Sequence, residues 1–335
     1  MSEIRRDPLL GYEVVIAPGR EARPQQWSTA PAQLDTSLLC PFCPGQEATT
    51  PHEVLVLPHV EGRVADSPDW QVRVIPNAFP SLNSDPLEPY GPSDDPFFAA
   101  RPAHGLQDVV IETPQHVAWV SQIPDQNLIW TFQAYQTRLR QIAATGQYRY
   151  AQVFKNCGPA AGASLEHTHS QIMASEEVPQ WIAAELTASR NYYRRQGHSF
   201  WEELIRRELE LGVRVVYADD DLVAFCPFAS RLPLETWILP RAAQADFREA
   251  KSPLLEKLAI VTKRLLAQIE KASKFAPYNF LIHTSPFDTI APEHYHWHLE
   301  ILPRVTVRAG FEWGTGMFVN PIAPERAAQA ITQAE

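Results

Sequence analysis

Two stretches of the sequence decide the fold: residues 153–172, VFKNCGPAAGASLEHTHSQI, and residues 280–301, FLIHTSPFDTIAPEHYHWHLEI. Each runs from a β-rich segment through a loop into a His-x-His motif. Each also follows a segment with apolar residues at helical spacing, residues 128–146 in the first half and 252–273 in the second. The order of strand, helix, strand and histidine motif therefore occurs twice. This repetition predicts an internal duplication of an α+β unit.

The segments between these stretches complete the expected architecture. Residues 70–82 and 106–120 each predict a strand and its exit, and residues 213–241 predict two or three strands with an acidic turn. Residues 179–211 predict helices that bridge the halves. The many prolines between 81 and 102 exclude a persistent helix or central strand and predict a long ordered loop. We place the domain boundary so that the two domains span 1–185 and 186–335.

Composition excludes several classes of protein. The 335 residues are 45% apolar and 20% charged, which is typical of a globular chain long enough for two domains. The net charge of -10, from 29 basic and 39 acidic side chains, argues against nucleic acid or anionic membrane as a partner. The start, MSEIRRDPLLGYEVV, lacks a signal peptide's apolar run, and no apolar stretch is long enough to span a bilayer. We therefore expect a soluble cytoplasmic protein.

The histidine motifs can be interpreted as strands, in which alternate side chains share one face. The shared faces carry His167, His169 and Gln171 in the first copy and His296, His298 and Glu300 in the second. Surface strands with incidental histidines are the alternative. Two copies at equivalent places, holding four of the 11 histidines, favour a functional patch. Neutral imidazole attacks phosphorus readily at pH 7, so such a patch suits a reversible nucleotidyl carrier.

Cysteine spacing indicates a further site. Four cysteines cannot form a disulfide framework in a chain of this length, and Cys40 and Cys43 form a Cys-x-x-Cys pair. That spacing supplies half of a tetrahedral zinc site, which two histidines would complete. A redox pair or two buried cysteines are the alternatives. Upstream of His167, the small residues of CGPAAGAS predict a loop that would let backbone amides approach a diphosphate, and an ordinary turn is the alternative.

Several of these motifs together resemble a known family. GASLEHTHSQI at 162–172, CPFC at 40–43, YHWHLEILPR at 295–304 and GFEWGTGMFVNP at 310–321 are similar to the bacterial type of galactose-1-phosphate uridylyltransferase, of the histidine-triad superfamily. The resemblance covers nearly the whole chain. It implies two tandem histidine-triad-like domains, each an antiparallel sheet with a packed long helix, and a homodimer with a shared active site.

The resemblance also implies an activity in galactose and carbohydrate metabolism. Enzymes of this family exchange UMP between UDP-glucose and galactose 1-phosphate by a ping-pong mechanism through a covalent uridylyl-histidine. His169 matches the nucleophile, and Gln171 would donate hydrogen bonds to a phosphoryl oxygen. The residues that match substrate-binding positions are Arg20, Arg23, Asn77, Asn156, Gly162, Ser164 and Glu312. The arginine pair is expected to act across the dimer interface.

The family's metal positions have counterparts here as well. His116 and His167 match the two ligands that complete a zinc site with Cys40 and Cys43. A second metal, iron or zinc, is expected at a group of three histidines and a carboxylate. Its ligands would be Glu185, His283, His296 and His298. Glu176 or Glu177 could replace Glu185, and a hydrogen-bonded core cluster without metal is the alternative.

Three departures from the family pattern leave the substrate open. Thr168 stands where many uridylyltransferases have proline, a change expected to loosen the backbone slightly, and plant-type relatives that phosphorolyse ADP-glucose carry a small hydroxyl residue there. Phe311 replaces a tyrosine, and an upstream lysine is missing. An ADP-glucose or dinucleotide phosphorylase with the same nucleotidyl-histidine is therefore an alternative. A nucleotide-binding module whose catalysis has decayed is another.

Overall fold

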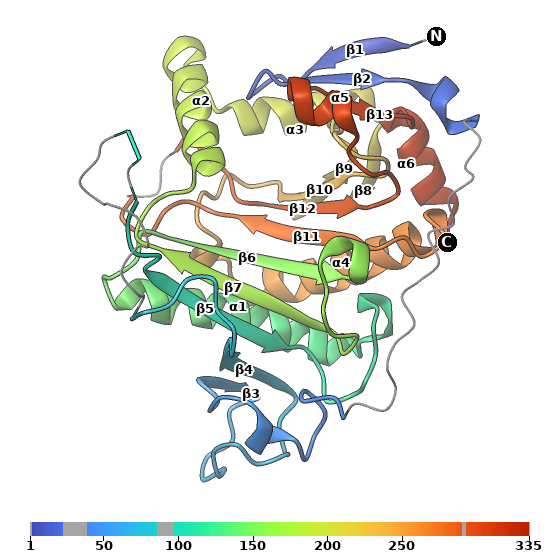
Figure 1. Cartoon of the computed structure of the whole chain (residues 1–335). Coiled ribbons are helices and arrows are strands. Elements are labelled where there is room, and N and C mark those ends of the chain that lie inside the picture. Colours follow the sequence, from blue (N-terminus) through green and yellow to red (C-terminus); the bar gives the residue numbers. More distant parts are fainter. Residues whose placement is uncertain (1, 23–38, 86–96, 99, 290–292, 335) are drawn as a thin grey trace.

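The computed structural model describes residues 2–22, 39–85, 97–98, 100–289 and 293–334. Its central feature is a ten-stranded sheet (Figure 1). In spatial order the strands are β3 (Leu55–Leu57), β4 (Val72–Pro76), β5 (Gly105–Ile111), β7 (His169–Ser175), β6 (Tyr150–Cys157), β11 (Tyr278–His283), β12 (His298–Pro303), β10 (Thr236–Pro240), β9 (Leu222–Phe225) and β8 (Val215–Ala218). All neighbouring strands in this sheet are antiparallel. The predicted α+β class with antiparallel pairing is confirmed.

The two halves of the chain contribute equivalent halves of this sheet. β6 and β11 pair at the centre, with Asn156 opposite Asn279. Outward from this pair the order is β7, β5, β4 and β3 on one side and β12, β10, β9 and β8 on the other. The same connectivity on both sides is what an internal duplication would produce. The duplication itself and the division at 185 and 186, which falls within a helix, stay predictions.

The α-helices are α1 (Asp125–Ala144), α2 (Gln180–Gln196), α3 (Phe200–Leu211), α4 (Ser252–Ala272), α5 (Gly310–Thr315) and α6 (Pro324–Gln333). Short 3-10 turns lie at Pro18–Ala22, Glu47–Thr49, Val120–Gln122, Pro159–Ala161 and Phe247–Glu249. Among the described residues, none of the helices is both long enough and apolar enough to cross a membrane.

The long helices form because each has one continuous apolar stripe. In α1, Leu128, Phe132, Tyr135, Leu139 and Ile142 follow one another at intervals of three or four and are all buried. α4 has the same pattern along its length. The two helices pack against each other and against one face of the sheet, and this layer forms the main core (Figure 1).

The bridging helices cover the opposite face, but only in the carboxyl-terminal half. α3 begins at Ser199, whose hydroxyl accepts from the Trp201 backbone N–H, and ends at Gly212 in the left-handed conformation. The Trp201 indole lies against the His298 ring of β12, with ring centroids 4.7 Å apart. Figure 1 shows no α-helix of the described chain over the corresponding face of β6 and β7. A helix therefore covers the second histidine motif, whereas no α-helix of the described chain covers the first (Figure 1).

A small second sheet joins the two ends of the chain. β1 (Glu3–Arg6) and β2 (Glu13–Ile16) are antiparallel, and β13 (Phe318–Asn320) pairs parallel to β2. Arg5 also forms an ion pair with Glu325 of α6. These contacts hold the amino-terminal segment against the carboxyl-terminal half, and α5 lies beside the same sheet (Figure 1).

Candidate active site and metal sites

The predicted nucleophile lies at the start of β7, between β5 and β6. The His169 side chain is 8% exposed, and its Nδ1 lies 2.8 Å from the backbone oxygen of His167. Because a carbonyl oxygen can only accept, the Nδ1 atom must carry the proton. The Nε2 atom therefore keeps its lone pair. The Phe42 ring contacts the imidazole edge to face, at 5.2 Å between centroids, and restricts its rotation.

Electrostatics keep this imidazole neutral. Burial lowers the pKa of His169, the Lys155 ammonium lowers it further, and the hydrogen bond to the His167 carbonyl only partly opposes this. A neutral ring with a free Nε2 lone pair is the form that attacks phosphorus at pH 7.

A buried ion pair holds the backbone of the nucleophile from behind. Lys155 on β6 and Glu112, just after β5, are 1% and 0% exposed, with 2.6 Å between Nζ and Oε2. The Lys155 Nζ also donates to the His169 carbonyl at 2.9 Å and to the Thr168 hydroxyl at 2.8 Å. The Thr168 hydroxyl in turn donates to Glu112 at 2.6 Å. Burial alone would raise the pKa of Glu112, but the Lys155 ammonium and the hydrogen bonds from Lys155, Thr168 and Ser170 together lower it below its ordinary value, so this carboxylate is charged.

This arrangement changes the expectation for residue 168. We expected the absence of proline to loosen the backbone, but the Thr168 hydroxyl ties this residue to two neighbouring strands. Its backbone N–H also donates to the Val117 carbonyl at 2.8 Å, a bond that proline could not make. Tyr135 of α1 completes the network, because its hydroxyl lies 2.6 Å from the Ser170 hydroxyl and donates to Glu112 at 3.2 Å.

The amide of Gln171 is oriented by two neighbouring amides. Its Oε1 atom accepts from Gln107 Nε2 at 2.6 Å and from Asn77 Nδ2 at 3.5 Å. Both contacts leave the Gln171 Nε2 free to donate to a ligand, and among the described residues it has no acceptor. Gln107 was not predicted. A polar residue within the apolar strand segment LQDVVI was the available signal.

The small-residue loop is attached to the neighbouring strand by Asn156. Gly158 and Gly162, at φ values of 83° and 93°, allow the tight turn, and a Cβ at Gly162 would approach the Asn156 amide. Asn279 of β11 donates to Asn156 Oδ1 at 2.8 Å and to the Ala161 carbonyl at 2.9 Å. Asn156 and its loop are thus fixed by a residue of the second half, which sequence reasoning missed. Ser164 and Gly162 are exposed on this loop.

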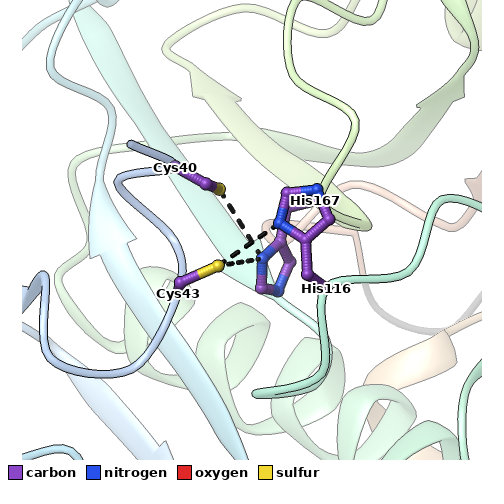
Figure 2. Close-up of side chains that lie close together, drawn as sticks. All are labelled: Cys40, Cys43, His116 and His167. Carbon is purple, nitrogen blue, oxygen red and sulfur yellow. Dashed lines mark hydrogen bonds between the residues drawn. The ribbon is translucent and has the colours of Figure 1, made fainter. Parts of the chain in front are cut away.

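Four predicted ligands come together at the amino-terminal metal site. Donor atoms of Cys40, Cys43, His116 and His167 all lie within 4.8 Å of one another. Figure 2 shows both sulfur atoms directed at the two imidazole rings. The Cys43 Sγ lies 3.3 Å from His116 Nδ1 and 3.6 Å from His167 Nδ1, and the Cys40 Sγ lies 3.7 Å from the latter (Figure 2). Tetrahedral zinc, with its usual bond lengths, would separate sulfur and nitrogen by about 3.5 Å.

The protonation states agree with a metal site. The Nε2 atom of His167 is 2.8 Å from the Thr113 carbonyl, so Nε2 carries the proton and the Nδ1 lone pair faces the cysteines. Burial lowers the pKa of His167 to about 4. Burial and the Cys40 thiol raise the pKa of Cys43 to about 11, and a bound cation would reverse this because it coordinates the thiolate. The donor set therefore fits a metal ion.

A second group of possible ligands lies under α2 and α3. Its members, all buried, are Glu185, His283, His298 and Glu300. His283 Nδ1 lies 3.1 Å from both Glu185 oxygens, and His298 Nε2 is buried with no hydrogen-bond partner among the described residues. An unpartnered buried nitrogen next to carboxylates fits a cation. Burial would lower the pKa of His283, but the Glu185 carboxylate raises it.

This group differs from the predicted one by one residue. His296 is not among the four residues whose donor atoms lie within 4.8 Å of one another. Its Nε2 atom lies 2.7 Å from the Pro240 carbonyl, as that of His167 lies near the Thr113 carbonyl, and its buried Nδ1 has no partner in the described chain. Glu300 takes its place, held by Arg231 at 2.6 Å. The alternatives Glu176 and Glu177 lie elsewhere, near His104 and Arg101 respectively.

The second histidine motif cannot serve as a second nucleophile site. His298 is 0% exposed and packs against the Trp201 and Trp237 rings, whose centroids lie 4.7 and 5.3 Å from its own. Glu300 occupies the position equivalent to Gln171 and is neutralised by Arg231. A phosphate group could not reach this histidine.

Two predicted substrate-binding residues do not contact His169 within the described chain, and a third lies outside the described residues. Arg20 is exposed in the first 3-10 turn, and Arg23 lies outside the described residues. Glu312 accepts from the Ala309 backbone N–H at 2.7 Å and caps α5. No contact joins Arg20 or Glu312 to His169 within the described chain, so their roles stay predictions.

Comparison with known proteins agrees with this geometry. The family model described as "Galactose-1-phosphate uridyl transferase, N-terminal domain" matches residues 1–179. The chain belongs to the galactose-1-phosphate uridylyltransferase family. A second model, described only as a domain of unknown function (DUF4921), matches residues 125–334. The family membership that the sequence motifs predicted is therefore confirmed.

The similar proteins are named for two different activities. ADP-glucose phosphorylase of Arabidopsis thaliana is 32% identical over 99% of this chain and 92% of its own. Galactose-1-phosphate uridylyltransferase of Thermotoga maritima is 27% identical over 100% and 99%. A crystal structure of the Arabidopsis phosphorylase with bound ADP-glucose superposes with a TM-score of 0.82, at 31% identity over 99% of both chains.

Proposed function

We propose that the protein is a nucleotidyltransferase that exchanges UMP between UDP-glucose and galactose 1-phosphate through a covalent uridylyl-His169. The observation that carries this function is the neutral imidazole of His169, whose Nδ1–H is fixed on a carbonyl and whose Nε2 lone pair is free.

In each half-reaction, one bond to phosphorus forms and another breaks. In the first, His169 Nε2 bonds to the α-phosphorus of UDP-glucose, and the bond from that phosphorus to the bridging oxygen breaks, releasing glucose 1-phosphate. The charge that develops on the ring is stabilised by the Nδ1–H bond to the His167 carbonyl. In the second, a phosphate oxygen of galactose 1-phosphate attacks the same phosphorus and the Nε2–P bond breaks. The Gln171 Nε2 would donate to a phosphoryl oxygen in both steps.

The metal groups support this arrangement in different ways. We propose zinc at Cys40, Cys43, His116 and His167, where it would fasten the amino-terminal segment to the residue two before the nucleophile. The group under α2 and α3 would hold iron or zinc and fix the bridging helix to the sheet. We further propose a cytoplasmic homodimer in which Arg20, Arg23 and Glu312 reach the substrate phosphates and sugar, Arg20 and Arg23 from the partner subunit.

A second candidate is ADP-glucose phosphorolysis through an adenylyl-His169, with orthophosphate as acceptor. Thr168 favours it, because plant-type relatives that phosphorolyse ADP-glucose carry a small hydroxyl residue at this position. The similarity to a plant ADP-glucose phosphorylase over nearly the full length favours it as well.

Initial-rate kinetics test the proposal. Purified protein is given UDP-glucose with galactose 1-phosphate, and separately ADP-glucose with orthophosphate, each over a matrix of concentrations. The proposal predicts parallel reciprocal plots, which mark a ping-pong mechanism, and faster turnover with the uridine pair. Faster turnover with the adenine pair would assign the phosphorylase activity instead. Intersecting plots with both pairs would contradict a covalent intermediate.

A further inference from the structure

A row of polar side chains crosses the centre of the sheet on the face of His169. β6 and β7 pair with Phe154 opposite Gln171, so Asn156 lies level with His169 on that face. β11 places Asn279 opposite Asn156. β12 places Leu302 opposite Asn279, and Arg304 follows two residues later, just past the end of the strand. The carboxyl-terminal half thus contributes to the face that carries the nucleophile.

Arg304 is fastened to this row. Its Nε donates to Asn279 Oδ1 at 2.6 Å, and its backbone N–H donates to the Pro277 carbonyl at 2.7 Å. Asn279 in turn holds Asn156 and the Ala161 carbonyl of the small-residue loop. The guanidinium is therefore linked through one side chain to the loop and to the asparagine that lie beside His169.

No carboxylate of the described residues pairs with the Arg304 guanidinium. Every other arginine that is buried or half-buried in the described residues forms an ion pair with a carboxylate. These are Arg5, Arg63, Arg73, Arg138, Arg214, Arg231 and Arg248. Arg304 is half-buried, has no carboxylate within ion-pair distance in the described chain, and uses only its Nε in hydrogen bonding there. Burial, Arg308 and Arg231 all lower its pKa.

A half-buried guanidinium without a counter-charge is costly unless an anion binds to it. Its two free Nη groups form a planar fork that matches two oxygens of a phosphate. We propose that Arg304 binds the phosphate that the leaving glucose 1-phosphate and the accepting sugar phosphate or orthophosphate have in common. This inference rests on the proposed function and names a phosphate-binding residue for it. Asn279 is then a positioning residue that sets the angle of the fork.

The experiment measures the second half-reaction alone. The nucleotidyl-enzyme is formed with UDP-glucose or ADP-glucose, freed of small molecules, and mixed with increasing glucose 1-phosphate, and loss of the adduct is followed by intact mass. Arg304→Gln should raise the half-saturating concentration about 10- to 100-fold, as expected for a charge-assisted hydrogen bond, with a much smaller change in the limiting rate. Arg304→Lys should recover part of the affinity, since it restores charge without the fork.

The matched control is Arg149→Gln, which removes an exposed arginine that pairs with Asp288 and should behave as wild type. Calorimetric titration of glucose 1-phosphate into the enzyme without nucleotide gives an independent readout, with the same expected order of affinities. Equal affinity of wild type and Arg304→Gln in that titration would overturn the inference, whether or not an adduct forms. A wild-type protein that binds glucose 1-phosphate through Arg304 but forms no adduct would contradict only the proposed function.

Discussion

The buried pair behind the nucleophile gives the sharpest structural prediction. Lys155→Met removes the ammonium and leaves the Glu112 carboxylate buried at 0% exposure, with only hydroxyl partners. Breaking a buried ion pair in this way typically costs about 3–5 kcal/mol. For a chain of this size, that corresponds to a fall in Tm on the order of 5 °C. Lys263→Met is the control, because its partner Asp125 is exposed and the pair contributes at most about 1 kcal/mol.

The double variant Lys155→Met/Glu112→Leu separates stability from catalysis. Replacing both charges by apolar groups of similar volume should recover most of the lost Tm. The rate of nucleotidyl-enzyme formation should stay about 100-fold low, because the His169 carbonyl and the Thr168 hydroxyl no longer have the ammonium that fixes them. Scanning calorimetry and single-turnover mass measurements follow the two quantities. A double variant with wild-type rate, or a stable single variant, would refute the reasoning.

Four further predictions follow from the same structure. Cys43→Ser should remove about one equivalent of tightly bound zinc in elemental analysis; unchanged metal content would exclude the amino-terminal site. Glu185→Gln should remove a second metal, and identical metal content would favour a hydrogen-bonded cluster instead. Gln171→Leu should slow adduct formation on His169 by about 100- to 1000-fold, whereas a normal rate would remove its role as a donor. Wild-type Tm should fall as the pH drops below about 4.5, because the pKa of Glu112 is lower in the folded than in the unfolded chain and its stabilising charge is lost on protonation; Glu112→Gln should show less of this acid loss.

The sequence predicted the fold well because its signals were periodic and repeated. The apolar stripes of α1 and α4 and the β-rich segments before each histidine motif all became the expected elements. The union of both halves into one ten-stranded sheet could not be predicted, since it depends on the pairing of β6 with β11 across more than a hundred residues. Strand pairing between segments so far apart leaves no local pattern in the sequence.

The sequence predicted those site residues that lie close together in one motif. The Cys40 and Cys43 pair and the His169 and Gln171 pair have the spacing that a turn or a strand imposes. His116 and His167 were expected as zinc ligands only from the resemblance to the family. The Lys155 and Glu112 pair was missed because the two residues meet only when β5, β6 and β7 align. The sequence could not show that the Glu300 carboxylate, and not the His296 ring, lies within 4.8 Å of Glu185, His283 and His298. Such contacts depend on tertiary neighbours, which sequence spacing does not reveal.

The most direct test of the central claim is intact-protein mass after brief incubation with UDP-glucose or ADP-glucose and no acceptor. The account predicts that wild type gains the mass of one nucleotidyl group, uridylyl in the first instance, and that His169→Ala gains none. An adduct of equal size on His169→Ala, or no adduct on wild type with either nucleotide sugar, would contradict a covalent mechanism at His169.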